Sequence, residues 1–328
     1  MGRIFFIIFL KYNKKYLLLF NFVLLIIFLA ILVRSAMFAI DSLIKFSKIT
    51  GIGEIAVGFI IVAVSTSAPE ISVAFFSTAS NNVGLTLGDI FGSNVTNIGL
   101  ISGVFLLLSP LRRIEIKSTG SLIPILLLAS VIPLLLLLVQ EGGRYIGLGL
   151  LAVFGFFIYY SIRTHLKLEQ IEKEKGSAKK QLVFYGIGIA IVILSAKMIV
   201  DSASTIAEIT GFKQSVIGAT LIALGTSLPE LTVDIVAIRR RHFELALGDI
   251  IGSCLVNITL VLGIVLVLSE VAINFQILST LIFFAIVSPV ILFGLIRKGK
   301  LYRWNGLVLF AIYGIFLITI YEIQLFIS

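Results

Sequence analysis

Long apolar runs separated by short polar or basic segments dominate the chain. A helix that crosses a bilayer needs about 20 mostly apolar residues, and ten runs come close to this length or exceed it. The pattern therefore predicts ten membrane-spanning helices, at roughly 17–44, 54–79, 83–108, 119–139, 144–161, 181–207, 213–238, 243–268, 273–296 and 303–326.

An additional apolar run, IFFIIFL, lies near the start of the chain and is followed by KYNKK. The run is too short to cross a membrane, and no small-residue cleavage site stands before the basic residues. We therefore expect an interfacial N-terminal segment and not a cleaved signal peptide.

Composition supports a membrane protein. Hydrophobic residues make up 59% of the 328 residues and charged residues 13%, whereas a soluble domain is about half apolar and about a quarter charged. The net charge of +9 arises from short basic bursts between apolar runs and not from a basic surface with interleaved aromatics, so no nucleic-acid partner is expected. The single cysteine, Cys254, excludes an internal disulfide and a zinc site with several cysteines. The expected partners are the lipid bilayer and cations. The oligomeric state stays open, and a monomer is compatible with the sequence.

Lysine and arginine are unevenly distributed among the nine connections between predicted spans. The odd-numbered connections carry most of them, and the even-numbered ones carry only Arg144 and Lys213. By the positive-inside rule the odd connections are cytoplasmic, which predicts a multi-pass protein of the cell (plasma) membrane with both termini extracellular. We give this pattern more weight than the four basic residues of the N-terminal tail, which oppose it: Arg3, Lys11, Lys14 and Lys15.

The sequence repeats itself at an offset of 160 residues. VAVSTSAPE at 62–70 returns as IALGTSLPE at 222–230, and GDIFGSNVTNIGL at 88–100 returns as GDIIGSCLVNITL at 248–260. The offset covers five predicted spans, and an odd number of spans reverses the direction of the chain across the membrane. The two halves are therefore expected to be inverted relative to each other.

This repeat predicts the fold class and the domain organisation. We expect an all-α integral membrane protein made of two inverted five-helix repeats, residues 15–161 and 181–328, joined by a charged cytoplasmic linker at 162–180. The loops agree with inversion, because an uncharged loop at 80–82 stands where the second half has a basic loop at 240–242. Inverted repeats are common in transporters, whose substrate sites lie near the midplane at interrupted helices.

Each half places a proline and a glutamate inside one predicted span. Pro69 and Pro229 remove a backbone donor and clash with the preceding turn, so the second and seventh helices are expected to be broken close to them. Glu70 and Glu230 follow directly, and ionisable residues within a membrane are costly and functional by default. These two glutamates are the main candidate ligands for a cation.

Other oxygen ligands recur beside the glutamates in both halves. A threonine and a serine precede each glutamate by four and three residues, and the next span carries a polar stripe with i, i+4, i+8 spacing. Hard oxygens of this kind suit calcium, sodium or magnesium and disfavour soft metals. The candidate ligands are Thr66, Ser67, Ser93 and Asn97 in the first half and Thr226, Ser227, Ser253 and Asn257 in the second.

Three further aspartates have more than one possible role. Asp89 and Asp249 begin the two polar stripes, and they either contact an ion as secondary ligands or brace helices through hydrogen bonds. Asp234 lies one turn after Glu230, but its repeat partner is Ala74. This asymmetry favours an auxiliary or access role for Asp234 over a central one.

The two pairs of motifs resemble the signature repeats of the sodium/calcium exchanger family, of the prokaryotic type, within the calcium/cation antiporter superfamily. The resemblance covers nearly the whole chain and implies calcium/sodium antiport by alternating access, in which the first and sixth spans slide across the rest. It implies a calcium site on Glu70 and Glu230 with the carbonyl groups of Thr66 and Thr226. It also implies sodium sites that use the following side chains: Ser67, Ser227, Ser93, Ser253, Asn97 and Asn257.

The sequence departs from the family pattern at two positions. Ser65 stands where the second motif has the usual Gly225. Asn257 stands where potassium-dependent relatives characteristically carry aspartate, so potassium co-transport is not expected. The motifs follow the sodium-type pattern and lack the GNxxE pattern of the proton/calcium branch.

Other functions fit the sequence less well. Proton-coupled calcium exchange remains an alternative, since a pair of glutamates can also carry protons. A passive cation channel and an intramembrane aspartyl protease are remote. The protease motif GxGD would need glycine at Thr86 or Ala246, and no Tyr-Asp pair occurs. No GxxxxGK[ST] phosphate loop exists, so ATP-driven pumping has no support. We expect a transporter with no enzymatic activity and no cofactor.

Overall fold

Helices make up nearly all of the structure. This computed structural model describes residues 14–50, 64–108, 113–115, 123–138, 143–165, 176–239, 243–269, 274–296 and 300–327. Eight helices in these ranges are long and apolar enough to cross a membrane, and each matches a predicted span. They cover Lys14–Ser42, Val83–Leu108, Gly143–Tyr160, Ala178–Thr210, Gln214–Arg239, Ala246–Leu268, Phe275–Ile296 and Asn305–Phe326.

The two remaining predicted spans have different outcomes. The start of the second, at 54–63, lies outside the described residues, as does the expected interfacial segment before Lys14. Of the fourth, at 119–139, the structure describes the apolar helical stretch Ile123–Leu138. Pro133 interrupts it with a 3-10 turn, since proline lacks the donor that a regular α-helix would need there.

The first half runs through helices that end close to the predicted boundaries. Helix α2 is longer than its predicted span of 17–44, and α9 continues into the expected linker. The elements are α2 (Lys14–Thr50), α4 (Ala68–Ala79), α5 (Val83–Val95), η1 (Thr96–Ile101), α6 (Ser102–Leu108), β1 (Arg113–Glu115), α7 (Ile123–Val131), η3 (Ile132–Leu134), α8 (Leu135–Leu138) and α9 (Gly143–His165).

The second half repeats much of this order. Its elements are α10 (Ala178–Thr210), α11 (Gln214–Ile217), η4 (Gly218–Ile222), α12 (Ala223–Thr226), α13 (Leu228–Arg239), α14 (Phe243–Leu255), η5 (Val256–Val261), α15 (Leu262–Leu268), α16 (Phe275–Ile296), β2 (Lys300–Tyr302) and α17 (Asn305–Ile327).

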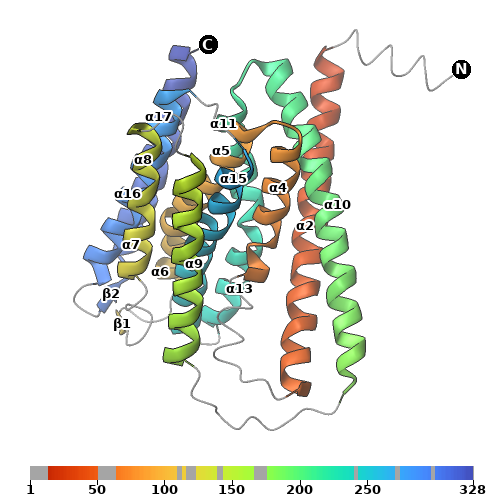
Figure 1. The fold of residues 1–328 in the computed structure, drawn as a ribbon, viewed down its shortest axis with the longest axis vertical. Coiled ribbons are helices and arrows are strands. Elements are labelled where there is room, and N and C mark those ends of the chain that lie inside the picture. The colour runs from red at the N-terminus through yellow and green to blue at the C-terminus, as the bar shows by residue number, and fades with distance from the viewer. Residues whose placement is uncertain are drawn as a thin grey trace, which may run out of the picture.

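The ends of the chain define two ends of the fold. Helix α2 begins and α17 ends at one end, which we call the terminal end (Figure 1). Helix α9 ends and α10 begins at the opposite end, which we call the linker end. Consequently α2 and α10 run in opposite directions, although they occupy the same position in the two halves.

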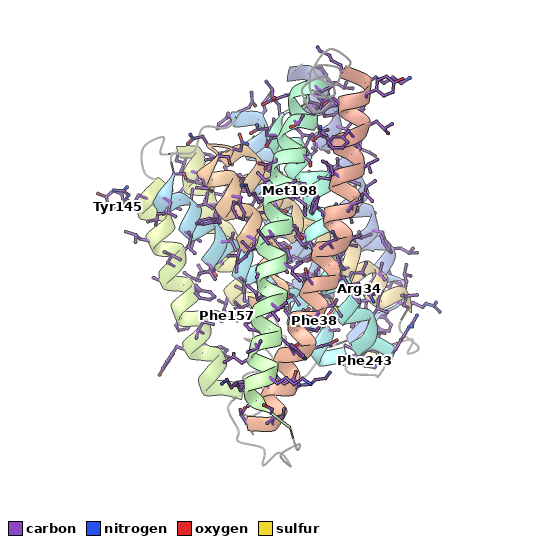
Figure 2. The ribbon with its side chains drawn as sticks, turned by 90° about the vertical axis from the view of Figure 1, so that its right-hand side faces the viewer. Arg34, Phe38, Tyr145, Phe157, Met198 and Phe243 are labelled. Carbon is purple, nitrogen blue, oxygen red and sulfur yellow. The ribbon has the colours of Figure 1, made fainter. Side chains whose placement is uncertain are left out.

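Helices α2 and α10 lie side by side on one flank of the bundle (Figure 2). They approach closely at Gly188, where an added Cβ would lie 2.8 Å from the Cβ of Ala39. With 37 and 33 residues, they would extend about 55 and 50 Å at 1.5 Å per residue, more than the hydrocarbon core requires. Their outward side chains are large and apolar, for example Ile26 and Leu194, which are 64% and 65% exposed. This is the composition of a lipid-facing surface.

The centre of the bundle is formed by the helices that carry the polar stripes. Helix α5 packs against the α11–η4 segment with backbones almost in contact: an added Cβ on Gly88 would lie 2.1 Å from the carbonyl oxygen of Ser215, and one on Gly92 would lie 2.6 Å from the Cα of Ala219. Gly88 and Gly92 are therefore packing residues at a close contact between helices. Small residues let helices in membranes approach this closely.

A short pair of strands was not predicted from the sequence. Strand β1 pairs antiparallel with β2, with Ile114 opposite Leu301. The pair lies near the linker end (Figure 1) and joins the segment after α6 to the segment between α16 and α17.

Candidate functional site

The two glutamates lie at interruptions of two helices. The first helix is interrupted at Ser67 and resumes as α4, and α12 ends before Ser227 and the chain resumes as α13. Both serines have similar backbone angles, with φ −78° and ψ 6° for Ser67 and φ −82° and ψ 4° for Ser227. The predicted breaks are therefore present just before Pro69 and Pro229.

Glu70 and Glu230 are fully buried, and each lies directly after one of the two interruptions. Among the described residues, none of their four carboxylate oxygens has a hydrogen-bond partner. Burying a carboxylate without a partner is strongly unfavourable, so such a group requires a bound cation or a proton. The pair therefore has the character of a cation site.

Asp89 and Asp249 connect the two halves. The Thr226 hydroxyl donates to Asp89 Oδ1 at 3.1 Å, and the Thr66 hydroxyl donates to Asp249 Oδ1 at 3.3 Å. Each aspartate thus binds the threonine at the interrupted helix of the other half. Their Oδ2 atoms have no hydrogen-bond partner in the described structure. Bracing is one role of these aspartates, and one oxygen of each remains available to a ligand.

The stripe serines join the same two clusters. The Ser253 hydroxyl lies 3.1 Å from that of Thr66, and the Ser93 hydroxyl lies 3.4 Å from that of Thr226. The structure therefore brings Thr66, Asp249 and Ser253 together, and separately Thr226, Asp89 and Ser93.

The other candidate ligands are buried without hydrogen-bond partners for their side chains in the part of the chain that is described. They are Ser67, Ser227, Asn97 and Asn257. In that part, no three or more acidic, histidine or cysteine side chains are grouped as a metal site. A metal ion at this position would therefore need the mixed hydroxyl, amide and carbonyl oxygens in addition to carboxylates.

Asn97 and Asn257 lie on π-helical turns, η1 and η5. These wider turns were not predicted, because the change from i→i+4 to i→i+5 bonding has no distinct side-chain signature. Single π-turns inside α-helices occur frequently at functional sites. Both turns follow directly after the helix that carries the aspartate and the serine of the polar stripe.

Two residues at the same repeat position meet at the centre. The Asn94 side-chain amide donates to the carbonyl oxygen of Cys254 at 3.1 Å, and the Cys254 thiol lies 3.8 Å from the carbonyl oxygen of Asn94. Asn94 was not singled out from the sequence, and Cys254 was considered there only for disulfide and zinc chemistry. The signal was present, because 94 and 254 differ by the repeat offset of 160.

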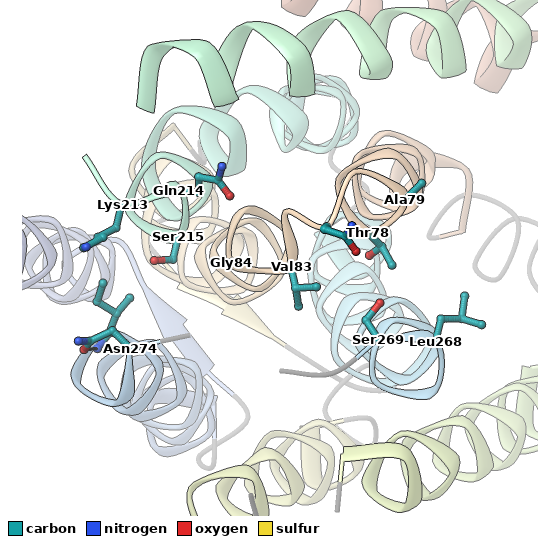
Figure 3. A pocket seen from close by; sticks show the side chains of 12 residues that line it. Thr78, Ala79, Val83, Gly84, Lys213, Gln214, Ser215, Leu268, Ser269 and Asn274 are labelled. Atoms are coloured by element: carbon teal, nitrogen blue, oxygen red, sulfur yellow. Dashed lines mark hydrogen bonds between the residues drawn. The ribbon is translucent and has the colours of Figure 1, made fainter. Parts of the chain in front are cut away.

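A cavity of about 770 Å³ opens at the terminal end (Figure 3). Polar side chains line it from helices and from the connections between them, among them Thr78, Asn81, Lys213, Gln214 and Asn274. None of the candidate ligands lines it. Thr78 is two turns from Glu70 along α4, about 12 Å at 1.5 Å per residue, so the cavity is a vestibule above the site and not the site itself.

Comparisons with known proteins agree with this arrangement. The profile of the sodium/calcium exchanger protein family matches residues 20–163 and again residues 180–322. The sodium/calcium exchanger MaX1 of Methanosarcina acetivorans is 28% identical over 92% of this chain and 99% of its own length. The inner membrane protein YrbG of Escherichia coli is 30% identical over 65% of this chain and 69% of its own length.

A solved structure has the same fold. The sodium–calcium exchanger NCX_Mj, soaked with sodium and strontium, superposes with a TM-score of 0.65 and 27% identity, over 92% of this chain and 97% of that one. The family profile covers most of the chain, with one match in each half. The chain therefore belongs to the sodium/calcium exchanger protein family.

Proposed function

We propose that this protein is a secondary active antiporter that exchanges calcium for sodium by alternating access. The observation that carries the proposal is the pair of buried glutamates at two helix interruptions, whose four carboxylate oxygens have no hydrogen-bond partner in the described parts of the chain. Two carboxylates neutralise one divalent ion, or they bind monovalent ions in its place. The names of MaX1 and NCX_Mj as sodium/calcium exchangers support this choice of ions.

The proposed calcium ligands are Glu70 and Glu230, with the carbonyl oxygens of Thr66 and Thr226. The proposed sodium ligands surround them: Ser67, Ser93, Asn97, Ser227, Ser253 and Asn257. Asp89 and Asp249 are secondary ligands, since each holds one threonine with Oδ1 and keeps Oδ2 unpartnered. An aspartyl protease is disfavoured, because each aspartate binds a different threonine.

The proposed architecture is two inverted five-helix repeats, 15–161 and 181–328, with a cytoplasmic linker and extracellular termini. Three observations support it. The family profile matches each half once, α2 and α10 run in opposite directions (Figure 1), and the repeat-related residues Asn94 and Cys254 contact each other.

The inverted topology predicts opposite accessibility for two equivalent regions. Single cysteines at Asn81 and Arg239, introduced into a Cys254→Ser background, should react with impermeant thiol reagents from opposite membrane faces. Asn81 is on the terminal-end vestibule and Arg239 is exposed at the end of α13. Labelling of both positions from the same face would exclude the inverted arrangement.

The proposed moving part is the α2–α10 pair. These helices share a hydrophobic cluster of their own, which includes Leu32, Val192 and Ala196 and which meets the bundle through apolar residues such as Val73 and Ile222. An apolar interface has few directional bonds to break, so it is suited to sliding.

Sodium should drive the exchange. If more than two sodium ions are exchanged for each calcium ion, every transport cycle moves net charge across the membrane. The membrane potential then changes the driving force for calcium uptake into sodium-loaded proteoliposomes by about 2.3 kcal/mol per charge per 100 mV. With Asn257 in place of aspartate, uptake should not require potassium. The measurement is calcium uptake with potassium present or absent and the potential clamped by an ionophore.

Proton-coupled calcium exchange is the second candidate, because unpartnered carboxylate oxygens accept protons as well as metal ions. The same proteoliposomes distinguish the two. Uptake that follows an imposed pH gradient and ignores the sodium gradient would assign the protein to the proton-coupled type.

A further inference from the structure

One buried carboxylate is not used by the proposed exchange site. Asp234 is 1% exposed, and neither of its oxygens has a hydrogen-bond partner among the described residues. It lies on α13, four residues after Glu230, and therefore on the same face of the helix. Its repeat partner, Ala74, is 4% exposed and belongs to the apolar core. At this repeat position a carboxylate is therefore present in the second half and absent from the first.

Asp234 is level with Asp249 across the α13–α14 hairpin. It lies five residues before the end of α13 at Arg239, and Asp249 lies six residues after the start of α14 at Phe243. The two helices pack against each other, and at about 1.5 Å per residue these positions are at nearly the same height.

The free oxygens of this pair are available to a ligand. Asp249 uses Oδ1 to accept from Thr66. Within the ranges that the structure describes, Oδ2 of Asp249 and both oxygens of Asp234 have no hydrogen-bond partner. Two neighbouring buried carboxylates without a positive partner repel each other and are poorly solvated. A cation between them removes both penalties.

The position of the pair along the transport path is also asymmetric. Helix α13 runs from the interruption toward the linker end (Figure 1), so Asp234 lies about one turn beyond Glu230 in that direction. Helix α4 runs toward the terminal-end vestibule, and there the equivalent position is the apolar Ala74. Asp89 is the counterpart of Asp249 on the terminal-end side, so among the described residues it is the pair of carboxylates, and not a single one, that is found on the linker-end side alone.

We propose that Asp234 and Oδ2 of Asp249 form an additional subsite for a hard cation, sodium or calcium, on the cytoplasmic side of the central glutamates. This inference rests on the proposed function for its direction of transport. Two carboxylates cannot complete the shell of such an ion, so water or backbone carbonyls supply the remaining ligands. The subsite accepts a partly hydrated ion between the cytoplasm and Glu230.

The first test compares the two membrane faces. In Asp234→Asn, the half-saturating calcium concentration should rise about tenfold at the cytoplasmic face, measured with inside-out vesicles, which corresponds to the loss of about 1.4 kcal/mol. It should stay within about twofold at the extracellular face, measured with right-side-out vesicles. Asp234→Glu should retain most of the wild-type value. Glu208→Gln, which removes an exposed charge on α10, is the control and should change neither value.

A mirrored variant sharpens the comparison. Ala74→Asp places a carboxylate at the equivalent position of the first half and should lower the half-saturating concentration at the extracellular face only. An equal effect of Asp234→Asn on both faces, or no effect on either, would overturn the proposal.

The second test does not depend on transport. In a purified Glu70→Gln/Glu230→Gln variant, millimolar calcium should still raise the thermal unfolding midpoint, because a ligand that binds only the folded state stabilises it. Adding Asp234→Asn to this variant should abolish the remaining shift. A shift that is unchanged by Asp234→Asn, or no shift before it is added, would show that the subsite does not exist. The proposed exchange is rejected by a different result, namely the absence of sodium-driven calcium uptake in vesicles that contain the wild-type protein.

Discussion

Glu70→Gln and Glu230→Gln should each abolish calcium exchange. Glutamine keeps the shape of the side chain but removes one of the two charges that face a desolvated divalent ion. Loss of one partner from a buried charge interaction costs about 3–5 kcal/mol, which corresponds to a fall in calcium affinity of about a hundredfold or more. Calcium binding to purified protein and calcium uptake into proteoliposomes both measure this effect.

The matched control for these variants is Glu208→Gln, since Glu208 is an exposed glutamate on α10. It should bind and transport calcium as the unmodified protein does. Near-normal exchange by both central variants would remove Glu70 and Glu230 from the proposed site.

Gly88→Ala should strongly destabilise the fold and reduce transport. The added methyl group would lie 2.1 Å from the carbonyl oxygen of Ser215 and 2.8 Å from the backbone nitrogen of Ala219. No side-chain rotation relieves a clash with backbone, so α5 has to move away from α11 and η4. Overpacking of this kind typically costs about 1–3 kcal/mol and sometimes more. The displacement also affects Asp89, the next residue, and its bond to Thr226.

The control for this substitution is a glycine with open space around it. An added Cβ on Gly149 or Gly155 in α9 meets nothing within 4 Å, and alanine is favoured over glycine in a helix by about 1 kcal/mol. Thermal unfolding in detergent should therefore give a much lower midpoint for Gly88→Ala and an equal or higher one for Gly155→Ala. Equal midpoints for all three proteins would contradict the close packing described above.

The sequence predicted the features that depend on local side-chain chemistry. Long apolar runs predict membrane-spanning helices because only the length and hydrophobicity of the run are needed, and not its contacts with other segments. Among the described residues, eight such helices are present. The breaks before Pro69 and Pro229 follow from the missing backbone donor, and they are found at Ser67 and Ser227. The burial of Glu70 and Glu230 follows from their position within apolar spans.

Features that depend on contacts between the halves could not be predicted in the same way. Spacing along the chain does not indicate that Thr66 binds Asp249 and Thr226 binds Asp89. The short β1–β2 pair joins segments more than a hundred residues apart, and three-residue strands carry too little alternation to be recognised. The 3-10 turn at Pro133 was also not predicted, because the long apolar run around it gave no sign of an interruption.

The contact between Asn94 and Cys254 has a consequence for how the two halves can diverge in sequence. In an assembly of two identical inverted subunits, a residue at this position would face its own copy, and every substitution would change both sides of the contact at once. Asparagine facing asparagine would then have to satisfy two amides with the same geometry. A single chain that holds both halves separates the two positions, so one can carry a long donor and the other a small thiol. The join between the halves thereby permits the one-sided acidic group at Asp234, which two identical subunits could not have.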